Sequence, residues 1–139
     1  MTRNYGNRRG QALLESALVT LVFLVLLIGV LDVCQVLFVH QTLVERSRNA
    51  VRYGAVRPYD ADAIRNMVLY NQLTAPGEQA PGVFGLTPSM VSVSRLDATL
   101  HEDRIVVAIT DYPFDFFSPF IAGAVRGKPI VATMPYEGT

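Results

Sequence analysis

The sequence predicts an α+β fold in which a long N-terminal helix packs on a small antiparallel sheet. Residues 16–31 carry no charged side chain, and apolar residues continue beyond this run at helical spacing. Three short segments rich in Val, Ile or alternating apolar residues follow later in the chain, with turn-forming residues between them. Successive strands with short connections favour antiparallel pairing, and the apolar side of the helix needs such a layer to cover it.

The first part of the long helix is apolar enough to cross a membrane. Twelve of the fifteen residues from 17 to 31 are Leu, Val, Ile or Phe, which favours insertion by about 4 to 7 kcal/mol. Glu15 and Asp32 bracket the run, about 25 Å apart along a helix. That length nearly spans a hydrocarbon core of about 30 Å if both carboxylates reach towards the interfaces. A buried helix of a soluble protein is disfavoured because the stretch is apolar on every face.

Beyond the apolar run, the helix is predicted to continue with one face turned to its own domain. Small and apolar residues recur there at three- and four-residue spacing: Val33, Val36, Leu37, His40, Leu43, Val44, Ser47, Val51 and Gly54. Gly54 and Pro58 are predicted to end the helix. Cys34 is the only cysteine, so no intrachain disulfide is possible, and it is expected to be a small buried apolar side chain.

The remaining chain predicts a short helix and three strands. Asp60 is suited to cap the helix, with Asp62 in its first turn. Its apolar side is expected to comprise Ile64, Met67, Val68 and Leu73. A loop rich in Pro and Gly is predicted at 74–88, strands at 90–94, 104–110 and 130–134, and a turn at 100–103.

An aromatic segment at 114–120 leaves two interpretations open. It contains Phe114, Phe116, Phe117 and Phe120. These rings either fill the space between sheet and helix or form a contact surface for a neighbouring subunit.

The N-terminus has the features of a cleaved leader. Arg3, Arg8 and Arg9 precede the apolar run with no acidic residue among them, and the basic stretch ends in Gly10. A secretory signal peptide would be cut after its apolar region instead. Because Gly10 has no side chain and little helix preference, the peptide bond to Gln11 is suited to an extended conformation in a protease cleft.

Three segments resemble the TadE-like pseudopilins of tight-adherence (Flp) type IV pilus systems. They are Arg-Gly-Gln-Ala-Leu-Leu-Glu at 9–15, Gly-Val-Leu-Asp at 29–32 and Arg-Asn-Ala-Val-Arg-Tyr-Gly at 48–54. The resemblance implies a pilin-like fold and cleavage between Gly10 and Gln11 by a prepilin peptidase. It also implies that Glu15 pairs with the new N-terminal amine of a neighbouring subunit during assembly. Alternatively, Glu15 is only a helix-start residue favoured by the helix dipole. Gln11 departs from the wider type IV pilins, where an aromatic residue or Met is usual.

The resemblance also implies a location and partners. Residues 1–10 would be the cleaved leader, 11–33 a transmembrane helix, and 34–139 an extracytoplasmic pilin-like domain that includes the continuing helix. The protein would be a single-pass protein of the bacterial inner membrane, with its N-terminus in the cytoplasm. Incorporation into a surface pilus is left open. Expected partners are the prepilin peptidase, other pilins and pseudopilins, the pilus assembly platform and membrane lipid.

No catalytic, metal or cofactor site is expected. The chain offers two histidines and one cysteine, and neither a zinc cluster nor a Cys/His pair is indicated. Its net charge of zero gives no reason to expect nucleic acid, and no small-molecule substrate is predicted. Two alternative functions stay open. A generic single-pass protein presenting a small binding domain would keep its leader, whereas a pseudopilin of a type II secretion system would share the leader chemistry.

Overall fold

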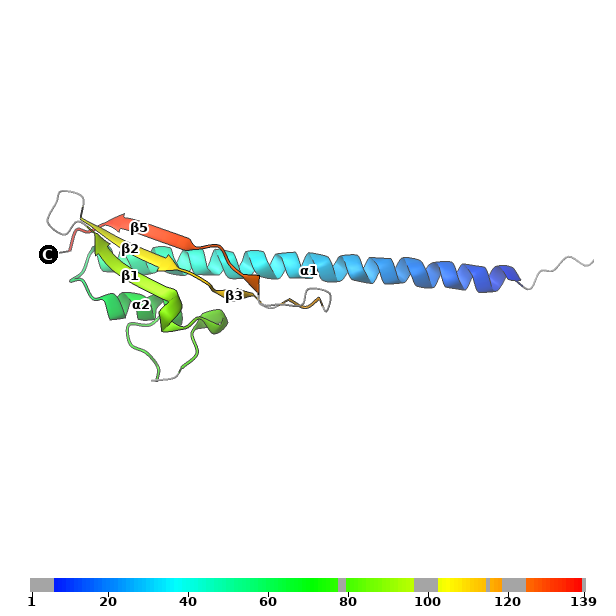
Figure 1. Cartoon of the computed structure of the whole chain (residues 1–139), viewed down its shortest axis with the longest axis horizontal. Coiled ribbons are helices and arrows are strands. Elements are labelled where there is room, and N and C mark those ends of the chain that lie inside the picture. Colours follow the sequence, from blue (N-terminus) through cyan, green and yellow to red (C-terminus); the bar gives the residue numbers. More distant parts are fainter. Residues whose placement is uncertain (1–6, 78–79, 97–102, 115, 119–124, 139) are drawn as a thin grey trace, which may run out of the picture. The chain divides into compact units, whose positions relative to one another are not determined.

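The computed structural model describes residues 7–77, 80–96, 103–114, 116–118 and 125–138. Its elements are α1 (Asn7–Ala55), α2 (Ala61–Tyr70), the 3₁₀ turns η1 (Val83–Gly85) and η2 (Pro88–Met90), and the strands β1 (Val91–Leu96), β2 (Arg104–Ile109), β3 (Pro113–Phe114), β4 (Val125–Arg126) and β5 (Ile130–Pro135) (Figure 1). The chain divides into two compact units. The first holds the described residues up to 35 together with 116–118, and the second holds the others.

The larger unit confirms the predicted α+β class. β1, β2 and β5 form an antiparallel sheet in that order, with Val107 of β2 opposite Val93 and Ala132 (Figure 1). Alternate residues of the sheet face the helix, as the period of two in a strand requires. The buried members are Val91, Ile105, Val107, Ile109 and Ile130. The C-terminal half of α1 covers this face with the fully buried Leu43 and nearly buried Val51.

The face that α1 presents to the sheet was only partly predicted. Leu43, Ser47, Val51 and Gly54 are buried as expected, but Val39 and Ala50 also belong to this face. Val33 and Leu37 are 59% and 56% exposed, so their prediction was wrong. Leu37 lies two residues before the buried Val39, about 200° around the helix, and therefore points away from the sheet.

The helix ends at Ala55, between the predicted Gly54 and Pro58, and Gly54 also has a packing role. A Cβ atom at Gly54 would lie 2.5 Å from Cδ1 of Ile64 and 3.1 Å from Cδ1 of Ile105. The glycine therefore lets α2 and β2 approach α1 closely. The carbonyl of Ala55 accepts a hydrogen bond of 2.8 Å from the backbone N–H of Glu137, which satisfies one of the terminal carbonyl groups of the helix.

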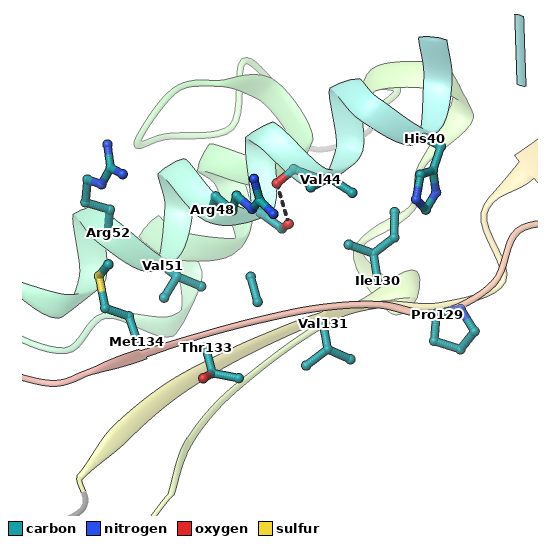
Figure 2. Close-up of a pocket in the computed structure, with 12 residues that line it drawn as sticks. His40, Val44, Arg48, Val51, Arg52, Pro129, Ile130, Val131, Thr133 and Met134 are labelled. Carbon is teal, nitrogen blue, oxygen red and sulfur yellow. Dashed lines mark hydrogen bonds between the residues drawn. The ribbon is translucent and has the colours of Figure 1, made fainter. Parts of the chain in front are cut away.

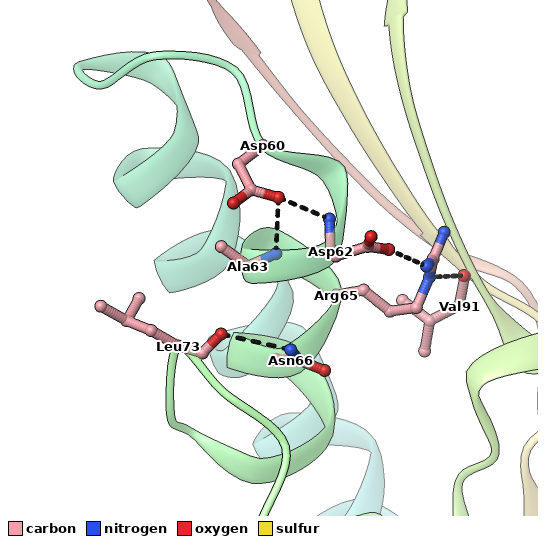
Figure 3. Close-up of polar contacts among 7 residues, drawn as sticks. All are labelled: Asp60, Asp62, Ala63, Arg65, Asn66, Leu73 and Val91. Carbon is pink, nitrogen blue, oxygen red and sulfur yellow. Dashed lines mark hydrogen bonds and ion pairs between the residues drawn. The ribbon is translucent and has the colours of Figure 1, made fainter. Parts of the chain in front are cut away.

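The predicted cap of α2 is confirmed (Figure 3). The Asp60 carboxylate accepts hydrogen bonds from the backbone N–H groups of Asp62 and Ala63 at 3.0 and 3.1 Å. Such a cap contributes about 1 kcal/mol. Arg65 pairs with Asp62 at 2.6 Å and donates from Nε to the carbonyl oxygen of Val91 at 3.3 Å, so the first turns of α2 are also tied to β1 (Figure 3).

The apolar side of α2 differs from the prediction at two positions. Ile64 and Val68 are fully buried, but the third buried residue is Leu69. Met67 is half-buried, and Leu73 lies beyond the helix and is 45% exposed. The helix ends because its C-cap, Asn71, adopts a left-handed conformation with φ of 56°.

The strands of the sheet begin and end close to the predicted residues, but several shorter elements were not predicted. The predicted loop at 74–88 contains η1 and the start of η2, and the two-residue pair β3–β4 was not predicted. Most of the predicted turn at 100–103 lies outside the described residues, which resume at Asp103. There, Asp103 accepts a bidentate charged contact from Arg95 of β1, and the guanidinium of Arg95 lies 3.9 Å from the ring centroid of Tyr136.

Candidate functional site

The predicted processing residues lie together on an exposed part of α1. Gly10, Gln11 and Glu15 are all exposed, and Glu15 follows Gln11 by about one helical turn. A Cβ atom at Gly10 would meet nothing within 4 Å. Gly10 is helical in the free chain, whereas the predicted extended bond after it belongs to the chain bound in a protease cleft. Cleavage there therefore requires local unwinding, and a glycine weakens a helix by about 0.5–1 kcal/mol relative to alanine.

Around these residues, α1 presents apolar side chains on all sides. The exposed large residues between 13 and 33 are Leu13, Leu14, Leu18, Val19, Leu21, Val22, Phe23, Leu24, Val25, Leu26, Leu27, Val30, Leu31 and Val33. In the described part of the chain, this is the one helix long and apolar enough to cross a membrane. Its most apolar window is only 6% buried, unlike the core helix of a soluble domain. The segment is therefore a candidate single-pass membrane anchor.

Asp32 does not reach towards solvent, which corrects the sequence-based expectation. Its side chain is 4% exposed. Oδ1 accepts hydrogen bonds from the backbone N–H groups of Phe117 at 2.7 Å and Ser118 at 3.3 Å, and Oδ2 lies 3.2 Å from the N–H of Ser118. All three residues belong to the smaller unit. The carboxylate is thus solvated by backbone amides of a loop 85 residues away in sequence.

The aromatic segment holds both buried and exposed rings. Phe114 is buried and packs edge-on against Tyr112, with ring centroids 5.1 Å apart. Phe117 is 71% exposed, so it is available for a contact outside the chain. Phe120 lies outside the described residues. Cys34 is an exposed free thiol on α1, so the predicted burial within the protein was wrong.

A groove runs between α1 and the edge strand β5 in the larger unit (Figure 2). It encloses about 520 Å³. Val44 and Val51 line it from the helix and Ile130 from the strand, with Arg48 and Arg52 also on the helix side (Figure 2). Within the described ranges, no group of three or more His, Cys, Asp or Glu side chains is placed to hold a metal ion.

Tyr112 is the largest fully buried side chain among the described residues of this unit. It is 1% exposed, and its hydroxyl lies 2.8 Å from Nδ1 of His40. A Cβ atom at Gly127 would lie 2.0 Å from Cζ of the ring, so only glycine allows this approach. Burial raises the pKa of the Tyr112 hydroxyl above its ordinary value of 10.0. The pair ties α1 at His40 to the segment between β2 and β3.

Alkaline pH should weaken the larger unit through Tyr112. Because its pKa is raised in the folded state, its neutral form contributes stability that is full below about pH 10 and is lost as the pH rises through the folded pKa. Tyr112→Phe should cost about 0.5–1.5 kcal/mol near neutral pH through the lost hydrogen bond to His40. That cost should shrink above about pH 10, because the variant has no phenol to ionise.

The measurement is urea unfolding of the detergent-solubilised chain followed by far-ultraviolet circular dichroism across this pH range. Asp60→Ala is the matched control, since it removes about 1 kcal/mol through the α2 cap without a phenol. Its cost should stay constant with pH. A Tyr112→Phe cost that also stays constant would contradict a raised pKa of the Tyr112 hydroxyl in the folded state.

Arg95 and Asp103 form a second electrostatic contact, at the turn end of the β1–β2 hairpin. The Arg95 guanidinium holds the pKa of the Asp103 carboxyl below its usual value of 3.8. The depressed pKa means that the contact stabilises the fold above that value and weakens as the pH falls through the folded pKa. Since both groups are near the surface, the contact serves mainly to align the hairpin.

Comparison with known proteins finds one family match, in the N-terminal part of the chain. Residues 10–52 match the model of the family described as TadE-like protein. No curated protein and no solved structure matches the chain. The matched segment begins at Gly10, includes Glu15 and Asp32, and extends along α1 into the larger unit. Residues 10–52 are therefore similar to the TadE-like protein family.

Proposed function

We propose that this protein is a minor pilin-like subunit, a pseudopilin, that serves structure and assembly in a Flp/Tad-type pilus. The observation that carries the proposal is the TadE-like match over residues 10–52, which starts at the glycine of the proposed cleavage site. The exposed apolar surface of α1 supports membrane anchoring, and the small α+β unit supports a pilin-like domain. The protein would act as a structural subunit that is anchored in the membrane.

In this proposal, a prepilin peptidase cuts between Gly10 and Gln11 at the cytoplasmic face of the inner membrane. The cut removes Arg3, Arg8 and Arg9 with the leader but leaves the apolar helix in the bilayer. Gln11 then carries a free α-amino group. The exposed Glu15 carboxylate, which is costly at membrane depth unless paired, would bind that amine on a neighbouring subunit.

The mass of the full-length protein tests the proposal directly. Protein extracted from membranes that contain the prepilin peptidase should lack the mass of residues 1–10, whereas membranes without the peptidase should yield the intact chain. An intact leader in both would favour a generic single-pass protein that presents a small domain. A type II secretion pseudopilin would also be cut. Whether the processed chain is found in Flp/Tad pili or in a type II secretion system therefore decides between these two functions.

A further inference from the structure

Asp32 joins two features that are each unfavourable next to lipid. One is its own carboxylate, which is buried on the apolar helix α1. The other is the irregular backbone at 116–118, whose N–H groups would be unsatisfied away from water. The hydrogen bonds from Phe117 and Ser118 to Asp32, at 2.7 to 3.3 Å, satisfy both at once.

Exposed apolar side chains flank this contact. Leu31 and Val33, the neighbours of Asp32 on the helix, are 49% and 59% exposed. Phe117, held by its backbone to Asp32, is 71% exposed. Leu31 and Val33 belong to the exposed apolar side chains of the candidate membrane span. The loop at 116–118 belongs to the same compact unit as these residues.

We propose that residues 116–118 are a membrane-contacting loop, with the Phe117 ring in the interface of the bilayer and Asp32 as the positioning residue that holds it there. Aromatic rings favour the boundary between headgroups and acyl chains. A loop can lie at that depth only when its backbone groups have partners, and Asp32 accepts hydrogen bonds from two of the loop's N–H groups. The proposal rests on the membrane anchoring in the proposed function, but it does not depend on cleavage or on pilus assembly.

Lipid is favoured over a protein partner because the loop extends a surface already suited to acyl chains. The exposed residues on either side of Asp32 are aliphatic, and the N–H groups of Phe117 and Ser118 point to the carboxylate. A neighbouring copy of the chain is the competing occupant, and the experiment distinguishes it.

The chain contains no tryptophan, so a single introduced tryptophan reports depth in the full-length protein. Phe117→Trp would be reconstituted in phosphatidylcholine–phosphatidylglycerol vesicles whose acyl chains carry bromine either near the headgroup or near the bilayer centre. Leu24→Trp, 52% exposed within the span, is the reference for the bilayer core. Val131→Trp, 58% exposed on β5, is the control of similar exposure outside the candidate span.

Phe117→Trp should be quenched most by bromine near the headgroup, Leu24→Trp most by bromine near the centre, and Val131→Trp by neither. Adding Asp32→Ala should remove most of the quenching of Phe117→Trp, whereas Asp32→Asn, which keeps one acceptor oxygen, should preserve more of it. Leu24→Trp in the same Asp32→Ala background should still be quenched, which shows that the chain remains inserted.

Two results would overturn the inference while leaving the anchor intact. In both, Leu24→Trp is quenched by lipid and Phe117→Trp is not. If the Phe117→Trp fluorophore is then open to aqueous iodide, the loop faces water. If it becomes shielded only as the protein-to-lipid ratio rises, the loop contacts a second copy. Failure of quenching at both Leu24→Trp and Phe117→Trp would instead contradict membrane anchoring and with it the proposed function.

Discussion

Replacing Gly10 by valine should leave a full-length precursor that still inserts into the membrane. A side chain at Gly10 touches nothing within 4 Å in the folded helix, so the variant does not disturb the chain itself. Its effect arises in the peptidase cleft, where the backbone must unwind and a β-branched side chain would crowd an extended bond and restrict its conformation. The apolar run that drives insertion is unchanged.

Gly29→Val is the matched control for this variant. Gly29 is also helical and exposed on α1, and a Cβ atom there meets nothing within 4 Å. Intact mass and membrane fractionation should show Gly29→Val cut and inserted, and Gly10→Val inserted but uncut. Normal cleavage of Gly10→Val would refute the assigned site. Loss of cleavage in both variants would mean that any valine substitution in this helix prevents processing.

Much of the fold follows from local patterns in the sequence. The period of the apolar residues predicts α1, and the aspartate before a helix predicts the cap at Asp60. The apolar alternation at 90–94 predicts β1, and the short apolar segments at 104–110 and 130–134 predict β2 and β5. Each of these signals acts over a few residues, where backbone hydrogen bonding and side-chain spacing are determined by near neighbours. The TadE-like segment was recognised for the same reason, since its motifs are contiguous.

The features that the sequence did not predict depend on pairs of residues far apart. The sequence predicts Asp32 as the polar end of a membrane span, whereas in the structure its carboxylate accepts a hydrogen bond from the backbone of Phe117. The burial of Tyr112 depends on the close approach of Gly127, and the role of Gly54 depends on Ile64 and Ile105. No local period encodes such contacts.

The side of α1 that faces the sheet was misplaced for a related reason. Val33 and Leu37 are apolar in a helix that is apolar all round at that end, so the pattern could not tell a lipid-suited face from a core face. Val39 and Ala50 are buried together with Leu43 in the larger unit, so they lie on the packed side of the helix. The position of the sheet therefore selects the core face.

Replacing Glu15 by alanine should leave cleavage normal and abolish incorporation into the pilus. The proposed partner of Glu15 is the α-amino group of Gln11 on a neighbouring subunit, which exists only after the leader has been removed. Glu15 is exposed in the single chain, so the variant should insert and fold like the natural protein. Loss of a partly desolvated charge pair would weaken the subunit contact by about 3–5 kcal/mol. A helix-dipole role alone would account for only about 0.3–1 kcal/mol and would leave assembly nearly intact.

Two further variants separate charge from helix position in this test. Glu15→Gln keeps the shape of the side chain without its charge and should also be cut but not incorporated. Glu45→Ala removes another exposed carboxylate of α1, outside the apolar run, and should be incorporated normally. Precursor mass and the amount of each variant in sheared pili provide the two readouts. If Glu15→Ala is incorporated like the natural chain, the pairing role is wrong even though the protein is processed, and the carboxylate then acts only on its own helix.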